Sequence, residues 1–212
     1  RKDMNELPTF NTAENGQTSF NWHERNRRRR TDRLFFCHLM DGTIADPIAL
    51  QATAWRQELG LKGKTIADHI SLVGLGDHDG LPEGLVELAH HIGSMIVAKP
   101  FDVSFDRLCA FGGGALVLRN SDGNPSLQEF WRNLTAVISD SPLKLFLTKS
   151  IEPHVTLLRD KVGVPKIRER AIEPISWTVR DFALVQSFIQ EGRYEVPHRW
   201  QLTGQDDARP AM

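Results

Sequence analysis

The chain has few cysteines and no long hydrophobic run. Cys37 and Cys109 are the only cysteines among its 212 residues, too few for the disulfide framework of a small secreted domain. No stretch approaches the roughly 18 consecutive apolar residues that indicate a transmembrane helix, and the first residues lack the pattern of a signal peptide. We therefore expect a cytoplasmic protein with two buried thiols. A disulfide between them is the less favoured alternative.

Most of the chain also lacks an excess of positive charge. Residues 1–33 carry 8 Lys and Arg against 5 Asp and Glu, and the remainder carries 18 against 22. A protein that grips long nucleic acid presents a strongly basic surface, because its cations must neutralise many phosphates. The charge balance therefore favours recognition of a single phosphate or of an RNA end over tracking along a duplex.

Composition predicts the domain organisation. A chain of this length can bury a sizeable core in one domain. Residues 1–32 are polar and aperiodic and contain four arginines at 27–30, which predicts a flexible basic tail. The functional alternative is that this segment is an arm that attracts RNA. We place the folded domain at residues 33–204 and a C-terminal tail at residues 205–212.

Hydrophobic periodicity predicts the order of the elements. Strands are expected at residues 33–40, 65–75, 101–111, 115–119, 149–159, 175–187 and 193–202, and helices at residues 44–59, 82–97 and 126–138. The glycines at 112–114 predict a hairpin turn and lack the Lys and Ser or Thr of a phosphate-binding loop. This order predicts an α+β fold with mostly antiparallel strands.

A short motif occurs twice, as HISL at residues 69–72 and as HVTL at residues 154–157. Each copy lies in a predicted strand, where residues i and i+2 point to the same side. The histidine and the hydroxyl residue of each copy therefore share a face. Such a motif occurs about once by chance in a chain of this composition, so the motif alone is weak evidence for a site. The apolar residues interleaved with it, which are typical of buried strands, strengthen that evidence. If the strands are neighbours, two imidazoles and two hydroxyls converge.

These groups suit chemistry on a phosphate ester. A neutral imidazole can serve as general base and an imidazolium as general acid, because histidine titrates near neutral pH. His69 and His154 could supply this pair, and the hydroxyls of Ser71 and Thr156 could donate hydrogen bonds to phosphate oxygens. The sequence weakly favours His154 as the base and His69 as the acid.

Six segments match the pattern of one known family in order: RLFF at 33–36, HISLVGLG at 69–76, EPHVTLLR at 152–159, LVQS at 184–187, GRY at 192–194 and WQL at 200–202. They resemble the two-histidine (2H) phosphoesterase superfamily, and within it the LigT-like RNA 2',3'-cyclic phosphodiesterases, also named 2'-5' RNA ligases. The resemblance covers about residues 33–202. It implies a bilobal fold, with two mostly antiparallel sheets that face each other across a central cleft and helices outside.

For function, the resemblance implies metal-independent hydrolysis of terminal 2',3'-cyclic phosphates of RNA or nucleotides to 2'-phosphates. It makes His69 and His154 the catalytic residues, and Ser71, Thr156 and Arg159 the residues that bind the substrate phosphate. We expect RNA ends or nucleotides as partners, a monomer, and no cofactor, metal or membrane. Ligation of RNA through a 2'-5' linkage at the same site and a non-catalytic RNA- or nucleotide-binding module are the alternatives.

Three positions need comment. Ser71 stands where the family usually has Thr, which keeps the hydroxyl and loses the methyl group that restricts the rotamer. Gly74 stands where the family usually has an aromatic residue, so we expect a more open wall. In a regular strand, Arg159 would point away from the face of His154. It reaches that face only if the strand bends or ends before it, and a surface arginine is the alternative.

Other features are weaker candidates. The sequence DHD at 77–79 resembles a set of metal ligands, but glycines flank it, so a polar turn is the favoured interpretation. The histidines at 90–91 are adjacent on a predicted helix and face different directions, which argues against a shared ligand. Phe35, Trp177 and Tyr194 are core candidates first, with stacking on a base as the alternative for one of them.

Overall fold

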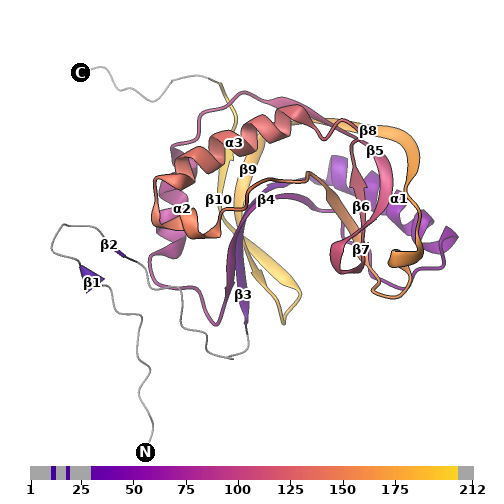
Figure 1. Cartoon of the computed structure of the whole chain (residues 1–212), viewed down its shortest axis with the longest axis horizontal. Coiled ribbons are helices and arrows are strands. Elements are labelled where there is room, and N and C mark those ends of the chain that lie inside the picture. Colours follow the sequence, from indigo (N-terminus) through magenta and orange to yellow (C-terminus); the bar gives the residue numbers. More distant parts are fainter. Residues whose placement is uncertain (1–10, 13–17, 20–29, 205–212) are drawn as a thin grey trace, which may run out of the picture.

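The structure is a computed structural model that describes residues 11–12, 18–19 and 30–204. Its helices are α1 (Gly42–Glu58), α2 (Leu85–Ser94) and α3 (Pro125–Ser139), with 3₁₀ turns at Gly112–Gly114, Pro142–Phe146 and Val164–Lys166 (Figure 1). Its strands are β1 (Asn11–Thr12), β2 (Thr18–Ser19), β3 (Asp32–Leu39), β4 (His69–His78), β5 (Phe101–Phe111), β6 (Ala115–Arg119), β7 (Val155–Arg159), β8 (Arg170–Val179), β9 (Asp181–Phe188) and β10 (Arg193–Gln201).

Eight strands form one antiparallel sheet in the order β10-β9-β3-β4-β7-β6-β5-β8, and β1 pairs with β2. The α+β class with antiparallel strands is confirmed, but the two separate sheets are not. Four strands on each side of the centre form matching halves, and β4 joins β7 through the antiparallel pair Ile70 and Val155. Both side chains are fully buried, so the halves are continuous through the core.

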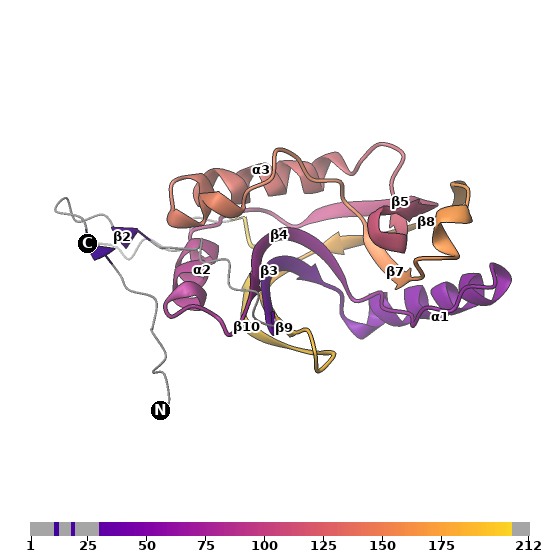
Figure 2. The ribbon, with the colours of Figure 1, turned by 60° about the horizontal axis from the view of Figure 1, so that its bottom comes forward.

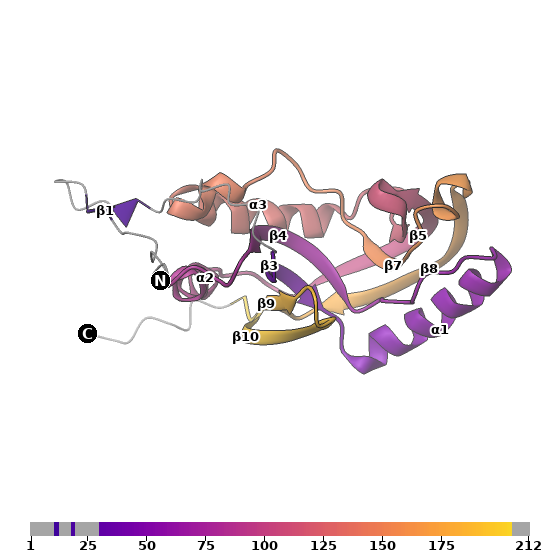
Figure 3. The same ribbon diagram turned by 90° about the horizontal axis from the view of Figure 1, so that it is seen from below.

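The three helices and one face of this sheet together form the main hydrophobic core. Their buried residues belong to a single cluster with the buried side chains of that face. In Figures 1 to 3, α2 and α3 lie together and α1 lies at the other end of the molecule, beside β7. On the opposite face two small apolar clusters form, one on each half of the sheet. The site residues lie on this second face.

Local sequence explains the ends of the helices. The carboxylate of Asp41 accepts hydrogen bonds from the backbone N–H groups of Thr43 and Ile44 at 2.9 and 3.3 Å, which caps α1. Gly60 follows the end of this helix at φ 64°, a conformation that glycine adopts without steric cost. The predicted apolar stripe of α3 is buried, as expected for an amphipathic helix.

Three predicted strands differ from the structure. The first motif strand begins at His69 rather than at residue 65, because Ala67 at φ 101° interrupts the extended chain before it. The second begins at Val155, directly after Pro153 and His154, since proline has no N–H for a ladder. The run 175–187 divides at Arg180 between β8 and β9, which lie in different halves of the sheet.

Cys37 and Cys109 are free and buried, as predicted. No helix in the described part of the chain is long and apolar enough to span a membrane. The predicted tails, most of residues 1–32 and all of 205–212, lie outside the described residues, so the domain limits stay predictions, as does a cytoplasmic location.

The Ile70–Val155 pair predicts a large stability effect. We expect Ile70→Ala to lower the free energy of unfolding by about 2–5 kcal/mol, because it leaves a cavity at the junction of the two halves. Leu50→Ala on α1 is a matched control, since Leu50 is 74 % exposed and its loss should change stability by no more than about 0.5 kcal/mol. Urea unfolding of both variants measures the difference, and equal effects would contradict the role of the junction.

Candidate active site

The pairing of β4 with β7 brings the two motifs together. In the antiparallel register set by Ile70 and Val155, His69 comes opposite Thr156 and Ser71 opposite His154. Because the paired residues are buried in the helix-covered core, the alternating polar residues point to the other face. The predicted convergence of two imidazoles and two hydroxyls is therefore what the fold produces, and each histidine lies beside the hydroxyl of the other motif.

An aromatic ring accompanies each histidine on this face. The ring of Phe35 lies 5.3 Å from that of His69, and the ring of Phe111 lies 4.5 Å from that of His154, measured between centroids. Each phenylalanine packs on one of the two small apolar clusters, which consist of Cys37, Leu39, Ala183 and Val185 in one half and of Cys109, Ala115 and Val117 in the other. The histidines are therefore flanked by apolar walls.

His154 is placed to be neutral at neutral pH. Its Nδ1 lies 2.7 Å from the backbone carbonyl oxygen of Glu152. A carbonyl only accepts, so Nδ1 carries the proton and Nε2 is the basic nitrogen of the neutral ring. Burial lowers the pKa of His154, and the positive charges of His69 and Arg159 lower it further, against an opposing effect of Glu152.

His69 has a different partner. Its Nδ1 lies 2.7 Å from Oδ1 of Asp68, and 27 % of its side chain is exposed. Burial raises the pKa of Asp68, but the hydrogen bond and the charge of His69 outweigh burial, so the pKa of Asp68 is lowered overall. The carboxylate is therefore ionised at neutral pH. One histidine contacts a carboxylate and the other contacts a neutral carbonyl.

Arg159 lies on the same face as the motif residues. On β6, Ala115 and Val117 are two residues apart and share a face, and their partners on β7 are Arg159 and Thr156, three residues apart. This register shift is a β-bulge, which reverses the alternation beyond Thr156. The guanidinium of Arg159 extends toward the turn between β5 and β6. Its Nη1 lies beside Gly113, 3.5 Å from the place where a Cβ atom would stand if that residue had a side chain. The strand is irregular, as the placement of Arg159 in the site requires.

The two departures from the family pattern both lie on this face. Ser71 is exposed and pairs across the ladder with Cys37 of β3. Gly74 is exposed and pairs with Phe35, and a Cβ built on it would meet no atom within 4 Å. The space that a side chain would occupy is open, as the sequence predicted.

Known families and structures agree with this geometry. The family model of the 2'-5' RNA ligase superfamily matches residues 44–187. The chain belongs to this superfamily. Its fold is similar to TT0787 of Thermus thermophilus (TM-score 0.64, 20 % identity) and to E. coli LigT complexed with NADP+ (TM-score 0.63, 22 % identity), each over 82 % of this chain and 99 % of the other. A crystal structure described as a phosphoesterase has a TM-score of 0.62 at 24 % identity, over 81 % and 99 %. No curated protein matches the sequence.

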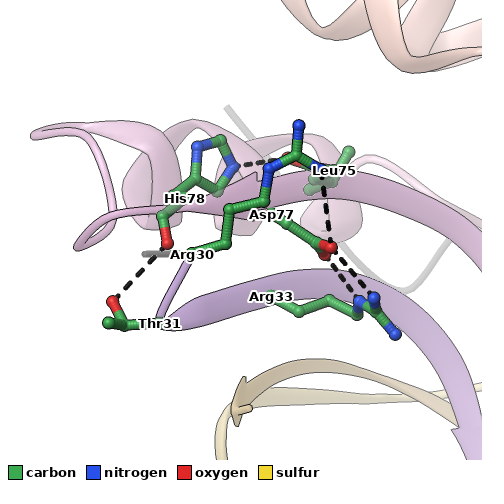
Figure 4. A network of polar contacts seen from close by, with 6 residues as sticks. All are labelled: Arg30, Thr31, Arg33, Leu75, Asp77 and His78. Atoms are coloured by element: carbon green, nitrogen blue, oxygen red, sulfur yellow. Dashed lines mark hydrogen bonds and ion pairs between the residues drawn. The ribbon is translucent and has the colours of Figure 1, made fainter. Parts of the chain in front are cut away.

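The DHD sequence lies at the end of β4, where Asp77 and His78 pair with residues of β3 and Asp79 follows the strand. Arg33 on β3 makes two hydrogen bonds to the carboxylate of Asp77, at 2.6 and 3.0 Å, and Arg30 lies 3.9 Å from it (Figure 4). Nε2 of His78 contacts the carbonyl oxygen of Leu75 at 2.8 Å. Among the described residues no group of three His, Cys, Asp or Glu side chains could hold a metal ion. The predicted polar turn is only partly right, because the strand continues through His78 and the bend begins at Asp79.

The aromatic candidates separate by face. Trp177 belongs to the core face, since it packs on Phe105 and its Nε1 donates to Nε2 of His38 at 3.1 Å. Phe35 lies at the site, and Tyr194 is 47 % exposed. Burial and the negative charge of Asp68 raise the pKa of Tyr194.

Sequence reasoning missed Asp68 and Phe111. Asp68 directly precedes the first motif, but regular alternation would turn it away from the ring of His69. Phe111 ends a strand in which Cys109 lies two residues earlier, so alternation could have put both on one face. The neighbour that brings Phe111 to His154 lies on another strand and is not visible in the local pattern.

The buried thiols predict low reactivity. Burial raises the pKa of Cys37 and of Cys109, so little of the reactive thiolate forms. We expect neither residue to be alkylated by iodoacetamide in the folded protein at about pH 8, and both to react in guanidinium. Mass spectrometry counts the labels, and labelling of the folded protein as fast as of the unfolded chain would contradict this account.

Proposed function

We propose that this chain hydrolyses terminal 2',3'-cyclic phosphates of RNA or nucleotides and leaves a 2'-phosphate. The observation that carries the proposal is the pair of imidazoles on one face with different partners: His69 contacts a carboxylate and His154 a neutral carbonyl. Two histidines in such unlike environments are suited to opposite roles in proton transfer. Membership of the superfamily and its RNA-related description support the substrate class.

In this mechanism His154 is the base and His69 the acid. Nε2 of neutral His154 takes a proton from water, and the oxygen of that water attacks phosphorus. The bond from phosphorus to the ribose O3' breaks on the opposite side, and protonated His69 donates its Nε2 proton to this oxygen. The product keeps the phosphate on O2'. The lowered pKa of His154 supports its role as the group that is unprotonated at neutral pH.

Three further residues would hold the phosphate. The hydroxyls of Ser71 and Thr156 lie on the face of the histidines and can donate hydrogen bonds to the non-bridging oxygens, where charge grows in the transition state. Arg159 adds a cation that suits a phosphate. E. coli LigT, whose fold is similar, has been crystallised with 3'-AMP and with phosphate, which supports a nucleotide phosphate at this site.

The second candidate is RNA joining through a 2'-5' linkage. It uses the same site in the reverse direction, with an RNA 5'-hydroxyl in place of water. The description of the matched family favours it, whereas the acidic balance of residues beyond 33 argues against binding of two RNA ends.

The histidines give the direct test. We expect His69→Ala and His154→Ala each to lower kcat/KM for a 2',3'-cyclic nucleotide by about 10²–10⁴-fold, because each removes one proton-transfer group. The assay is hydrolysis of cyclic nucleotides and of a short RNA that ends in a cyclic phosphate, with EDTA present. His91→Ala is the matched control, since His91 is exposed on α2.

Near-normal turnover by either histidine variant would refute the mechanism. Binding of the cyclic nucleotide without turnover by the wild type would favour the non-catalytic module. Joining of a cyclic-phosphate RNA to a 5'-hydroxyl RNA, faster than hydrolysis, would favour the ligase.

The pKa of His154 predicts the pH dependence. Since this pKa lies below the usual value of about 6.5, the base is already free at neutral pH. The rate should fall only as the pH drops below about 6.5, when His154 takes up a proton. A pH–rate profile of kcat/KM checks this, and an acid limb centred above about 7 would contradict it.

A further inference from the structure

Asp68 has no counterpart in the second motif, where proline precedes the histidine. We propose that Asp68 is a positioning residue for His69: its carboxylate fixes the ring through Nδ1 and so presents Nε2 to the substrate. The role of Asp68 in the reaction rests on the proposed function. The contact between Asp68 and His69 does not depend on that function.

The geometry is that of a strong hydrogen bond. The 2.7 Å between Oδ1 of Asp68 and Nδ1 of His69 lies in the range of hydrogen bonds between charged groups. An ionised carboxylate only accepts, so Nδ1 donates, and Nε2 is the nitrogen left for the substrate. Phe35 lies against the ring and limits its rotation. The ring therefore has one favoured orientation.

The backbone is shaped to allow this contact. In a regular strand Asp68 would point away from the ring of the next residue. Here β4 begins only at His69, and the preceding Ala67 is buried at φ 101°, a conformation that costs free energy in a non-glycine residue. The N–H of Met40 donates to the carbonyl oxygen of Asp68 at 2.9 Å. The surrounding structure thus holds Asp68 in place.

Asp68 supplies the charge closest to the His69 ring. His154 interacts electrostatically with His69, and Tyr194 on β10 and Cys37 on β3 interact with Asp68. Charges further out are Arg159 and Glu152 beside His154, and Arg199 and Asp181 beside Cys37. Burial lowers the pKa of His154 and raises that of Tyr194, so both are largely neutral at neutral pH. Arg199 and Asp181 form an ion pair at 2.9 Å and offset each other. The negative charge in direct contact with His69 therefore comes from Asp68.

The decisive variant is Asp68→Asn, which keeps the shape and removes the charge. Asp79→Asn is the matched control, because Asp79 is exposed just beyond β4. We expect Asp68→Asn to lower kcat by about 10- to 100-fold, the factor that corresponds to one hydrogen bond between charged groups. KM should change little. Asp68→Glu should restore part of the rate.

An NMR measurement without substrate separates this proposal from the proposed function. The Nδ1 proton of His69 should give a downfield signal that is absent in His69→Ala, moves upfield in Asp68→Asn and is unchanged in Asp79→Asn. If the wild type hydrolyses no cyclic phosphate, the proposed function fails and this signal still decides the contact. An unchanged signal in Asp68→Asn, or an unchanged kcat in an active enzyme, would overturn the proposal.

Discussion

The antiparallel pair between Ile70 and Val155 is the contact on which the site depends. It joins the two halves of the sheet, and its side chains point into the core. Since alternate residues of a strand face opposite sides, a slip of one residue would bury the histidines and expose the apolar residues. The hydrophobic effect that stabilises this junction therefore also sets which residues share the face of the two histidines. Stability of the core and geometry of the site have the same origin.

One continuous sheet has consequences that two separate sheets would not have. The motif strands are neighbours in a single ladder, so their separation is close to the usual strand spacing of about 4.8 Å. The distance between the histidines then does not depend on how two lobes meet. Groups on or next to strands of a sheet are held more rigidly than groups on long loops, which favours a fixed geometry between the two histidines.

The scaffold is nearly symmetric and the charges on it are not. Each half contributes one histidine, one hydroxyl and one phenylalanine to the shared face. The difference comes from the atoms bonded to Nδ1, a carboxylate oxygen of Asp68 for His69 and a carbonyl oxygen of Glu152 for His154. The two histidines are therefore not equivalent, and two titratable groups in unlike surroundings are what a general acid and a general base require.

Local patterns determined much of this protein. The bounds of β5 and β6, the apolar stripe of α3 and the existence of a strand at each motif could be predicted, because periodicity within a segment reports which side of it is buried. His154 itself lies just before its strand. Tertiary structure alone decided the rest. The bulge that turns Arg159 to the site exists only against β6, and Asp68 reaches His69 only because Ala67 interrupts the strand. Bulges and strand pairs depend on contacts between segments far apart in the chain, and no pattern within one segment contains them.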